Sequence, residues 1–331
     1  MIILSWLYAI VTGIRNGMYS FSILKSKRVE GVEVICIGNI TVGGTGKTPM
    51  VQYFAKKYLD EGRKVAIVSR GYKGKRSIDP MVVSDYTSIK AKIDESGDEP
   101  FLHASCLAGI PVIVAKKRYE GVELAKKTFN SDLVILDDGF QHRQLFRDKN
   151  IVLIDATDPF GGGKLLPQGR LREPLNGLKR ANEIIITKSN LVGRAEIEKI
   201  VSVLQKFSKP LLYSSFSSLL LVEDKEVDLK KILGLHVMVI SAIAKPENIY
   251  KTVSSFRPNF IEERPFPDHH HYTPADIEQF YRLKEQKVID FFVTTQKDWV
   301  KLSQLLSARH KKDWVVIKQN YILGEKLDAI I

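Results

Sequence analysis

The sequence is poor in cysteine: only Cys36 and Cys106 occur among its 331 residues. Cys36 lies in an apolar run and Cys106 in a stretch of small residues, so we expect two buried free thiols. A disulfide framework is thereby excluded, and a reducing compartment fits. The chain also lacks a long block of Lys and Arg, an RNA-binding aromatic motif, an internal repeat and a low-complexity segment. Nucleic acid is therefore disfavoured as a partner.

Acidic residues are fewer than basic ones. The chain has 38 Asp and Glu against 50 Lys and Arg, which gives a net charge of +12. Such a surface favours an anionic partner, either an acidic lipid or a phosphorylated substrate, although a merely basic soluble protein would carry the same charge. The length predicts two domains of moderate size, each able to bury its own core.

The first segment, residues 1–14 (MIILSWLYAIVTGI), has no charged side chain. It is shorter than the roughly 20 apolar residues of a spanning helix. A secretory signal would begin with positive charge and end at a small-residue cleavage site, and neither is present. Two interpretations stay open: a helix packed on the domain, and a helix lying in a membrane interface. Trp6 and Tyr8 suit an interfacial depth, and Arg15 and Arg28 would meet anionic head groups.

Beyond residue 30, β-branched apolar runs alternate with helical stretches. The runs are apolar throughout, which indicates strands buried on both faces. Strands that alternate with helices predict a doubly wound, parallel α/β sheet followed by a second, smaller α/β domain. The expected strands are 32–37, 64–69, 111–115, 133–136, 151–154, 183–187, 236–241, 290–295 and 314–318, and the expected helices are 48–61, 118–129, 193–207, 246–255 and 274–285.

A glycine-rich segment follows the first of these strands and opens a helix. This is the context of a phosphate-binding P-loop, in which backbone N–H groups and a helix N-terminus surround phosphate oxygens. Lys47 would reach the β- and γ-phosphates of ATP, and the Thr48 hydroxyl would ligate Mg²⁺. Thr41 stands where the usual pattern has glycine, and Gly43 and Gly44 would supply the flexibility instead. The predicted nucleotide-binding residues are Thr41, Val42, Gly43, Gly44, Thr45, Gly46, Lys47 and Thr48.

Two adjacent aspartates end another buried strand. A P-loop requires an acidic partner of this kind for its magnesium, so Asp137 and Asp138 are candidate metal residues, and which lies nearer the metal stays open. Further on, residues 187–190 (TKSN) are similar to a guanine-reading T-K-x-D motif, but Asn190 replaces its Asp. We therefore expect ATP rather than GTP. The segment is expected to be a simple turn at the end of a strand, with a position near the nucleotide base as the alternative.

The predicted P-loop NTPase-like fold divides into four parts. Residues 1–30 form a membrane-associating helical segment, 31–209 the nucleotide-binding domain, 210–235 an extended linker, and 236–331 a smaller α/β domain that closes over the active site.

Six segments stand out along the chain: GNITVGGTGKTP (38–49), RGY (70–72), GDEP (97–100), DDGFQH (137–142), PQGRLREP (167–174) and FPDHH (266–270). Together they resemble one family, the tetraacyldisaccharide 4′-kinases of lipid A biosynthesis. The resemblance runs from the N-terminal segment to about residue 297. It implies transfer of the ATP γ-phosphoryl group to the 4′-hydroxyl of a tetraacylated glucosamine disaccharide 1-phosphate. It also implies a peripheral enzyme on the cytoplasmic face of the inner membrane of a Gram-negative-type bacterium.

The family resemblance assigns the catalytic base to Asp98, which begins a predicted helix where an anion is favoured. His269, or its neighbour His270, would hydrogen-bond Asp98 from the second domain, so that domain closure completes the site. Lys47 is the third expected catalytic residue. A metal-binding role for the run of histidines at 269–271 is an alternative without supporting ligand spacing.

Basic residues supply the predicted substrate contacts. Arg170 and Arg172, in a Gly- and Pro-rich loop with Gln168, would neutralise the transferring phosphate or hold the 1-phosphate of the acceptor. His142 would lie at the carboxyl edge of the sheet, where ligands bind in such folds. Arg70 adds positive charge, with an ordinary solvated surface as its alternative.

Three other functions remain open at this stage. One is a soluble P-loop enzyme acting on a small carboxylate or amine. Another is a nucleotide-dependent switch, which the missing Asp of T-K-x-D disfavours. The last is a basic protein that binds nucleic acid or membrane and keeps a vestigial nucleotide site.

Overall fold

The chain folds into two compact units. The computed structural model describes residues 2–243 and 245–324. The first unit comprises Met1–Phe216 and the segment that begins at Tyr321, and the second comprises Ser217–Asn320. The chain leaves the first unit within strand β8 (Leu211–Val222) and returns to it within β13 (Trp314–Gly324). The finer division at residues 30, 209 and 235 stays a prediction.

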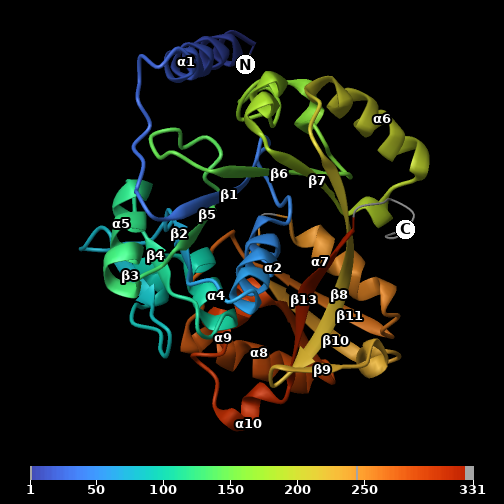
Figure 1. The fold of residues 1–331 in the computed structure, drawn as a ribbon. Helices are drawn as coiled ribbons and strands as arrows, with labels where there is room; N and C mark the ends of the chain where they lie inside the picture. Colours follow the sequence, from blue (N-terminus) through green and yellow to red (C-terminus); the bar gives the residue numbers. More distant parts are fainter. Residues whose placement is uncertain (1, 244, 325–331) are drawn as a thin grey trace. The chain divides into compact units, whose positions relative to one another are not determined.

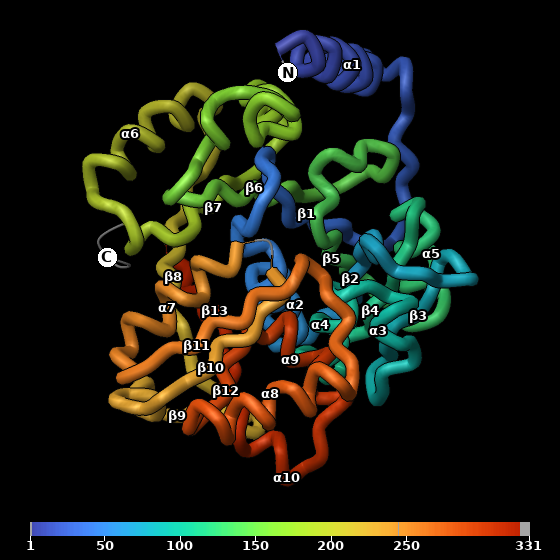
Figure 2. The backbone as a smooth tube through the Cα atoms, turned by 180° about the vertical axis from the view of Figure 1, so that it is seen from behind, coloured from blue at the N-terminus to red at the C-terminus, as the bar shows by residue number. Residues whose placement is uncertain are grey.

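The sheet of the first unit has the strand order β8-β7-β6-β1-β5-β2-β4-β3, which can be followed in Figures 1 and 2. Neighbouring strands from β8 to β4 are parallel, and β3 pairs antiparallel at the edge. The strands are β1 (Glu33–Asn39), β2 (Val65–Ser69), β3 (Met81–Ser84), β4 (Val112–Val114), β5 (Leu133–Asp137), β6 (Lys149–Asp155) and β7 (Glu183–Thr187). The predicted parallel sheet is therefore confirmed.

Helices cover both faces of this sheet. On one face, α2 (Lys47–Asp60) and α4 (Asp98–Cys106), which follows the short α3 (Ile93–Ser96), pack against Ile35 and Ile37 of β1. On the other face, α5 (Arg118–Phe129) and α6 (Arg194–Leu204) pack against Val34 and Cys36. Successive residues of β1 thus enter opposite cores, as the continuous apolar runs predicted.

Each cysteine is a free thiol, but only one of them is fully buried. Cys36 is buried, whereas Cys106 is half-buried at the end of α4, so the expectation of two buried thiols was wrong for Cys106.

Helix α1 (Ile2–Ser20) is longer than the apolar segment that predicted it. One face of α1 contacts the rest of the first unit, and Ser5 on this face is buried. Most of the helix is exposed, including Trp6 at 68%. Among residues 2–243 and 245–324, no helix has the length and apolarity needed to cross a membrane.

The second unit is a smaller α/β unit. Its strands β11 (Phe260–Pro265), β10 (His236–Ser241), β12 (Phe291–Thr295) and β13 are parallel neighbours in that order, and β9 (Lys225–Val227) pairs antiparallel with β8. Its helices are α7 (Pro246–Ser255), α8 (Pro274–Gln286), α9 (Gln296–Leu302) and α10 (Ala308–Lys311). Phe280, Phe292 and Trp314 are among the largest side chains of its core.

Candidate active site

The phosphate loop follows β1, as predicted, and leads into α2. Six of the eight predicted nucleotide-binding residues, Thr41 to Gly46, lie in the loop, and Lys47 and Thr48 begin the helix. Gly46 precedes α2 in the left-handed conformation, with φ 84°. The amide of Asn39, at the end of β1, donates to Thr45 Oγ1 (3.0 Å) and accepts from Lys47 Nζ (3.4 Å). These bonds stabilise the curled conformation of the loop, with Lys47 at the first turn of the helix.

The TKSN segment supports the phosphate loop from the end of β7. Thr187 Oγ1 donates to the carbonyl of Thr45 (3.1 Å), and Lys188 Nζ donates to the carbonyl of Gly44 (3.0 Å) while pairing with Asp155. The next residue but one, Asn190, is bonded to the backbone of Phe216. The segment is a turn, as predicted, but its Thr and Lys also hold the loop, which the sequence did not reveal.

The acidic pair lies at the carboxyl end of β5, next to β1. Asp138 has φ 53°, a left-handed conformation that Asp tolerates better than most residues. Its carboxylate accepts from Arg172 Nη1 (2.8 Å) and lies 3.9 Å from Lys47 Nζ. Burial raises the pKa of Asp138, but the charges of Lys47 and Arg172 outweigh it, and the net pKa is lowered. Asp138 is therefore ionised beside the phosphate loop.

Asp137 has a different partner. His103 Nε2 lies 3.3 Å from Asp137 Oδ2, and both side chains are buried. Sequence reasoning missed His103, because a lone histidine inside a helix has no local signal for a role. Within described residues, His103 Nδ1 has no hydrogen-bond partner.

Asp98, the predicted base, begins α4 and is buried. The preceding Gly97 has φ 86°, and a Cβ there would lie 2.5 Å from the carbonyl oxygen of Tyr72. The GDEP motif and the RGY motif therefore touch through their backbones, and only glycine permits this approach. Because α4 also contains His103, one helix joins the candidate base to the acidic pair.

A basic cluster lies beside these residues. Burial and then the charge of Arg70 lower the pKa of Arg118 to about 10. Burial, followed by the charges of Arg118, Arg147, Arg15 and Arg70, lowers the pKa of His142 to about 4. The charge of Arg70, another predicted substrate residue, thus contributes to the lowered pKa of His142, and His142 is neutral at pH 7. Arg118 was not among the predicted site residues, and its side chain is buried.

The two predicted arginines of the 165–173 segment face the nucleotide-binding residues. Arg170 donates through Nε and Nη2 to the carbonyl of Val42 (3.1 and 2.8 Å) and pairs with Asp158. Arg172 pairs with Asp138, as above. Gln168 uses its backbone N–H to bond Ser5 of α1 (3.1 Å). Contact of these three residues with a substrate stays a prediction.

His269 belongs to the second unit. It has φ 68°, its N–H donates to the carbonyl of Ala242 (3.1 Å), and its Nε2 lies 3.4 Å from Lys297 Nζ. The neighbouring His270 pairs with Asp276 (3.4 Å). Pairing of His269 with Asp98 stays a prediction.

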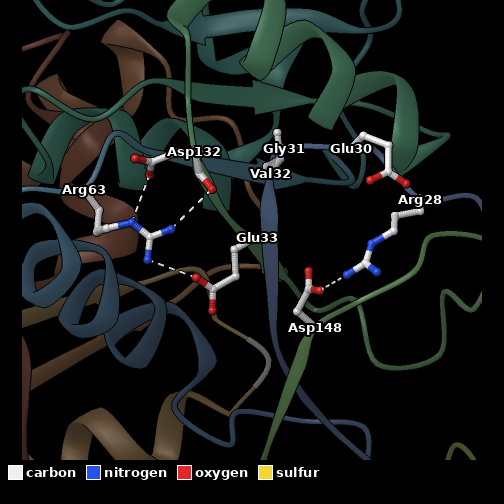
Figure 3. A pocket seen from close by; sticks show the side chains of 8 residues that line it. All are labelled: Arg28, Glu30, Gly31, Val32, Glu33, Arg63, Asp132 and Asp148. Atoms are coloured by element: carbon white, nitrogen blue, oxygen red, sulfur yellow. Dashed lines mark hydrogen bonds and ion pairs between the residues drawn. The ribbon is translucent and has the colours of Figure 1, made fainter.

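An open depression lies at the amino ends of the strands of the first sheet, and its charged residues pair with one another. Figure 3 shows Arg63 joined to Asp132 and Glu33, and Arg28 joined to Asp148. Glu33 begins β1 and Asp132 immediately precedes β5, so these ion pairs tie the amino ends of the strands together. Ligands of parallel α/β sheets bind at the carboxyl ends, where the phosphate loop lies.

Comparison with known proteins identifies the family. The family model for LpxK, tetraacyldisaccharide-1-P 4′-kinase, matches residues 1–331. The chain belongs to this family. It is 38% identical over 317 residues to the tetraacyldisaccharide 4′-kinase of Halothermothrix orenii, covering 91% of this chain and 82% of that one. It is 35% identical over 314 residues to that of Syntrophus aciditrophicus, covering 92% and 84%.

A solved structure supports the same assignment. The crystal structure of LpxK from Aquifex aeolicus in complex with ATP matches with a TM-score of 0.76 at 30% identity, covering 99% of this chain and 97% of that chain. The resemblance predicted from the six motifs is confirmed, and so are the kinase activity and the P-loop α/β fold with a smaller second unit.

Proposed function

We propose that this kinase transfers the γ-phosphoryl group of ATP to the 4′-hydroxyl of a tetraacylated glucosamine disaccharide 1-phosphate, a lipid A precursor. The observation that carries the proposal is the convergence of Lys47 and Arg172 on Asp138 beside the phosphate loop, in a member of a family of 4′-kinases. Phosphoryl transfer depends mainly on positioning and on charge neutralisation, which such a constellation supplies.

The residues around the loop fit Mg²⁺. This ion is usually held by one or two carboxylates, a hydroxyl and the phosphates of the substrate, and does not require a cage made only of protein ligands. Asp138 is kept ionised by its basic neighbours, Asp137 is adjacent, and Thr48 is in the first turn of α2. When bound, the metal would neutralise charge on the phosphate oxygens.

Asp98 is the proposed proton acceptor for the 4′-hydroxyl. Its position at the first turn of α4 places the carboxylate near the positive end of the helix dipole, which stabilises the ionised form needed to accept a proton. A sugar hydroxyl is a poor acid, so the proton leaves late, when the bond to phosphorus is forming.

The basic cluster is proposed to receive the anionic part of the acceptor. Arg70 and Arg118 raise the local positive potential, and neutral His142 supplies a ring nitrogen, Nε2, that is buried and lacks a hydrogen-bond partner among described residues. A phosphate group would replace the water that such guanidinium groups otherwise require.

We further propose that the enzyme works at the cytoplasmic face of the inner membrane, held there peripherally by α1. The exposed residues of α1 include Ile3 (76%), Trp6 (68%) and Val11 (64%), which is unusual for a helix that faces only water. The net charge of +12 complements anionic head groups.

The test is transfer of label from γ-labelled ATP to purified tetraacyldisaccharide 1-phosphate in mixed micelles. Wild type and the exposed control Asp94→Asn should label the lipid, and Asp98→Asn should be slower by about a hundredfold or more. Label from an unimpaired Asp98→Asn variant would keep the kinase and remove Asp98 from the base role. If wild type binds ATP but leaves the lipid unlabelled, the proposed reaction is wrong.

A further inference from the structure

Helix α1 has a polar stripe opposite its exposed apolar face. Ser5, Tyr8 and Asn16 are separated by three and by eight residues, spacings that place them on one helix face. Ser5 Oγ donates to the carbonyl of Leu165 (3.2 Å), and Asn16 Nδ2 donates to Glu173 (3.3 Å). The hydroxyl of Tyr8 donates to the carbonyl of Arg172 (2.7 Å). The stripe therefore follows a single segment, residues 165–173, which we name the arginine loop.

The arginine loop is bonded on its other side to the phosphate loop. The N–H of Arg172 donates to the carbonyl of Ile40 (2.7 Å), and the N–H of Val42 donates to the carbonyl of Arg170 (2.8 Å). Thr41 and Leu171 form an antiparallel bridge between these bonds. The arginine loop is thus a short ribbon with α1 along one edge and the nucleotide-binding residues along the other.

Arg172 contacts α1, the phosphate-loop segment and the acidic pair. Its carbonyl accepts from Tyr8, its N–H bonds the phosphate-loop segment, and its guanidinium contacts both oxygens of Asp138 (2.8 and 2.9 Å). A change in the backbone conformation of Arg172 would move its guanidinium relative to Asp138. The hydrogen bond from the Tyr8 hydroxyl opposes such a change. Burial raises the pKa of Tyr8, so the hydroxyl stays protonated and able to donate.

We propose that Tyr8 is a positioning residue for phosphoryl transfer: it fixes Arg172, and so couples the seating of α1 on a lipid surface to the geometry of Asp138. The inference rests on the kinase reaction proposed above. The apolar face of α1 would meet the lipid while the polar stripe holds the arginine loop. The helix would then be a structural part of the reaction centre as well as an anchor. The enzyme would be most active when α1 is bound to the lipid surface.

The first experiment compares Tyr8→Phe with the matched control Tyr19→Phe. Both variants lose one hydroxyl from α1, and the control keeps the ring that lies under Arg143. For Tyr8→Phe we expect kcat for lipid phosphorylation to fall roughly three- to tenfold, the loss of one hydrogen bond. The KM for ATP and sedimentation with anionic phosphatidylglycerol vesicles should be unchanged, because the ring and the apolar face remain. Tyr19→Phe should match wild type in all three.

Two outcomes of that experiment would overturn the inference. A wild-type kcat for Tyr8→Phe would show that the hydroxyl does not position anything that matters to the reaction. A loss of vesicle binding in parallel with activity would show that Tyr8 only docks the anchor. Absence of transfer by wild type itself would instead refute the proposed function.

A second experiment does not depend on the reaction. Amide hydrogen exchange of residues 165–173 is followed with and without the same vesicles. Wild type and Tyr19→Phe should gain protection in the arginine loop when vesicles are present, and Tyr8→Phe should gain much less while unfolding at a similar temperature. Equal gains in all three proteins would disprove the coupling, whatever the transfer assay shows.

Discussion

His103 Nε2 lies 3.3 Å from Oδ2 of Asp137, and both side chains are buried. A buried carboxylate is costly unless it is paired, so the imidazole stabilises Asp137 where it ends β5. The two residues are 34 positions apart in sequence. Their contact also ties α4, and with it Asp98, to the acidic pair.

Replacement of His103 should therefore destabilise the protein. His103→Ala removes the partner of Asp137 and leaves a cavity, and we expect the free energy of unfolding to fall by about 2–4 kcal/mol. His103→Gln, which can place an N–H near the same carboxylate, should recover part of that loss. Urea denaturation measures both variants. Equal stability of His103→Ala and wild type would show that the contact contributes nothing.

Lys47 should be required for transfer. Its ammonium group lies between Asn39 and Asp138 in the predicted phosphate loop, so Lys47→Ala would remove the positive charge that we expect to contact the transferred phosphate. We expect kcat/KM to fall by about a hundredfold or more. Lys57→Ala, at the exposed far end of the same helix, is the control and should stay within twofold of wild type. Similar activities of the two variants would contradict the assignment.

The adjacent glycines of the phosphate loop should respond differently to alanine. Gly43 has φ 124°, and a Cβ there would lie 2.2 Å from Arg170 Nη2, whereas a Cβ at Gly44 would meet nothing within 4 Å. Gly43→Ala should cost about 1–3 kcal/mol, because it combines backbone strain with displacement of Arg170. Gly44→Ala should unfold at nearly the wild-type temperature. Calorimetry without nucleotide makes the comparison, and the reverse order of stabilities would refute it.

The pH dependence of the free energy of unfolding below about pH 6.5 should depend on His142. Its pKa falls from 6.5 to about 4 in the folded protein, mainly through burial. Between these values the unfolded chain binds a proton that the folded chain does not, so stability falls as the pH is lowered from about 6.5 towards 4.

His142→Gln should flatten this part of the profile, while the exposed control His271→Gln should leave it as in wild type. Urea midpoints at pH 7.5 and pH 5 provide the measurement. An unchanged slope in His142→Gln would show that another group causes the loss of stability.

Trp6 offers a direct test of membrane contact. The sequence has three tryptophans, and the other two, Trp299 and Trp314, are buried in the second unit. A blue shift of the fluorescence on adding anionic vesicles should therefore come from Trp6, which is 68% exposed. The shift should disappear in Trp6→Phe and weaken at high salt. A shift that persists in Trp6→Phe would exclude α1 as its source.

Local sequence predicted much of the fold. The buried strands β1, β5 and β7 were recognisable as short runs that are apolar throughout, and helices such as α5 because apolar residues recur with the helical period. Strand β3 and helix α9 were missed because β3 is not a continuous buried run and α9 follows β12 directly, with too few residues to show a helical repeat. The expectation for Cys106 was wrong because the end of a helix is only partly covered.

The sequence by itself determined the phosphate loop, the acidic pair and the family, because each is recognised from short motifs whose residues are adjacent in the chain. Only the tertiary structure decided which side chains meet. Arg172 reaches Asp138, His103 reaches Asp137, and Tyr8 reaches Arg172 across 164 positions. Such contacts follow from the order in which parallel strands pair and from the loops that this order brings together, and no local pattern encodes that order.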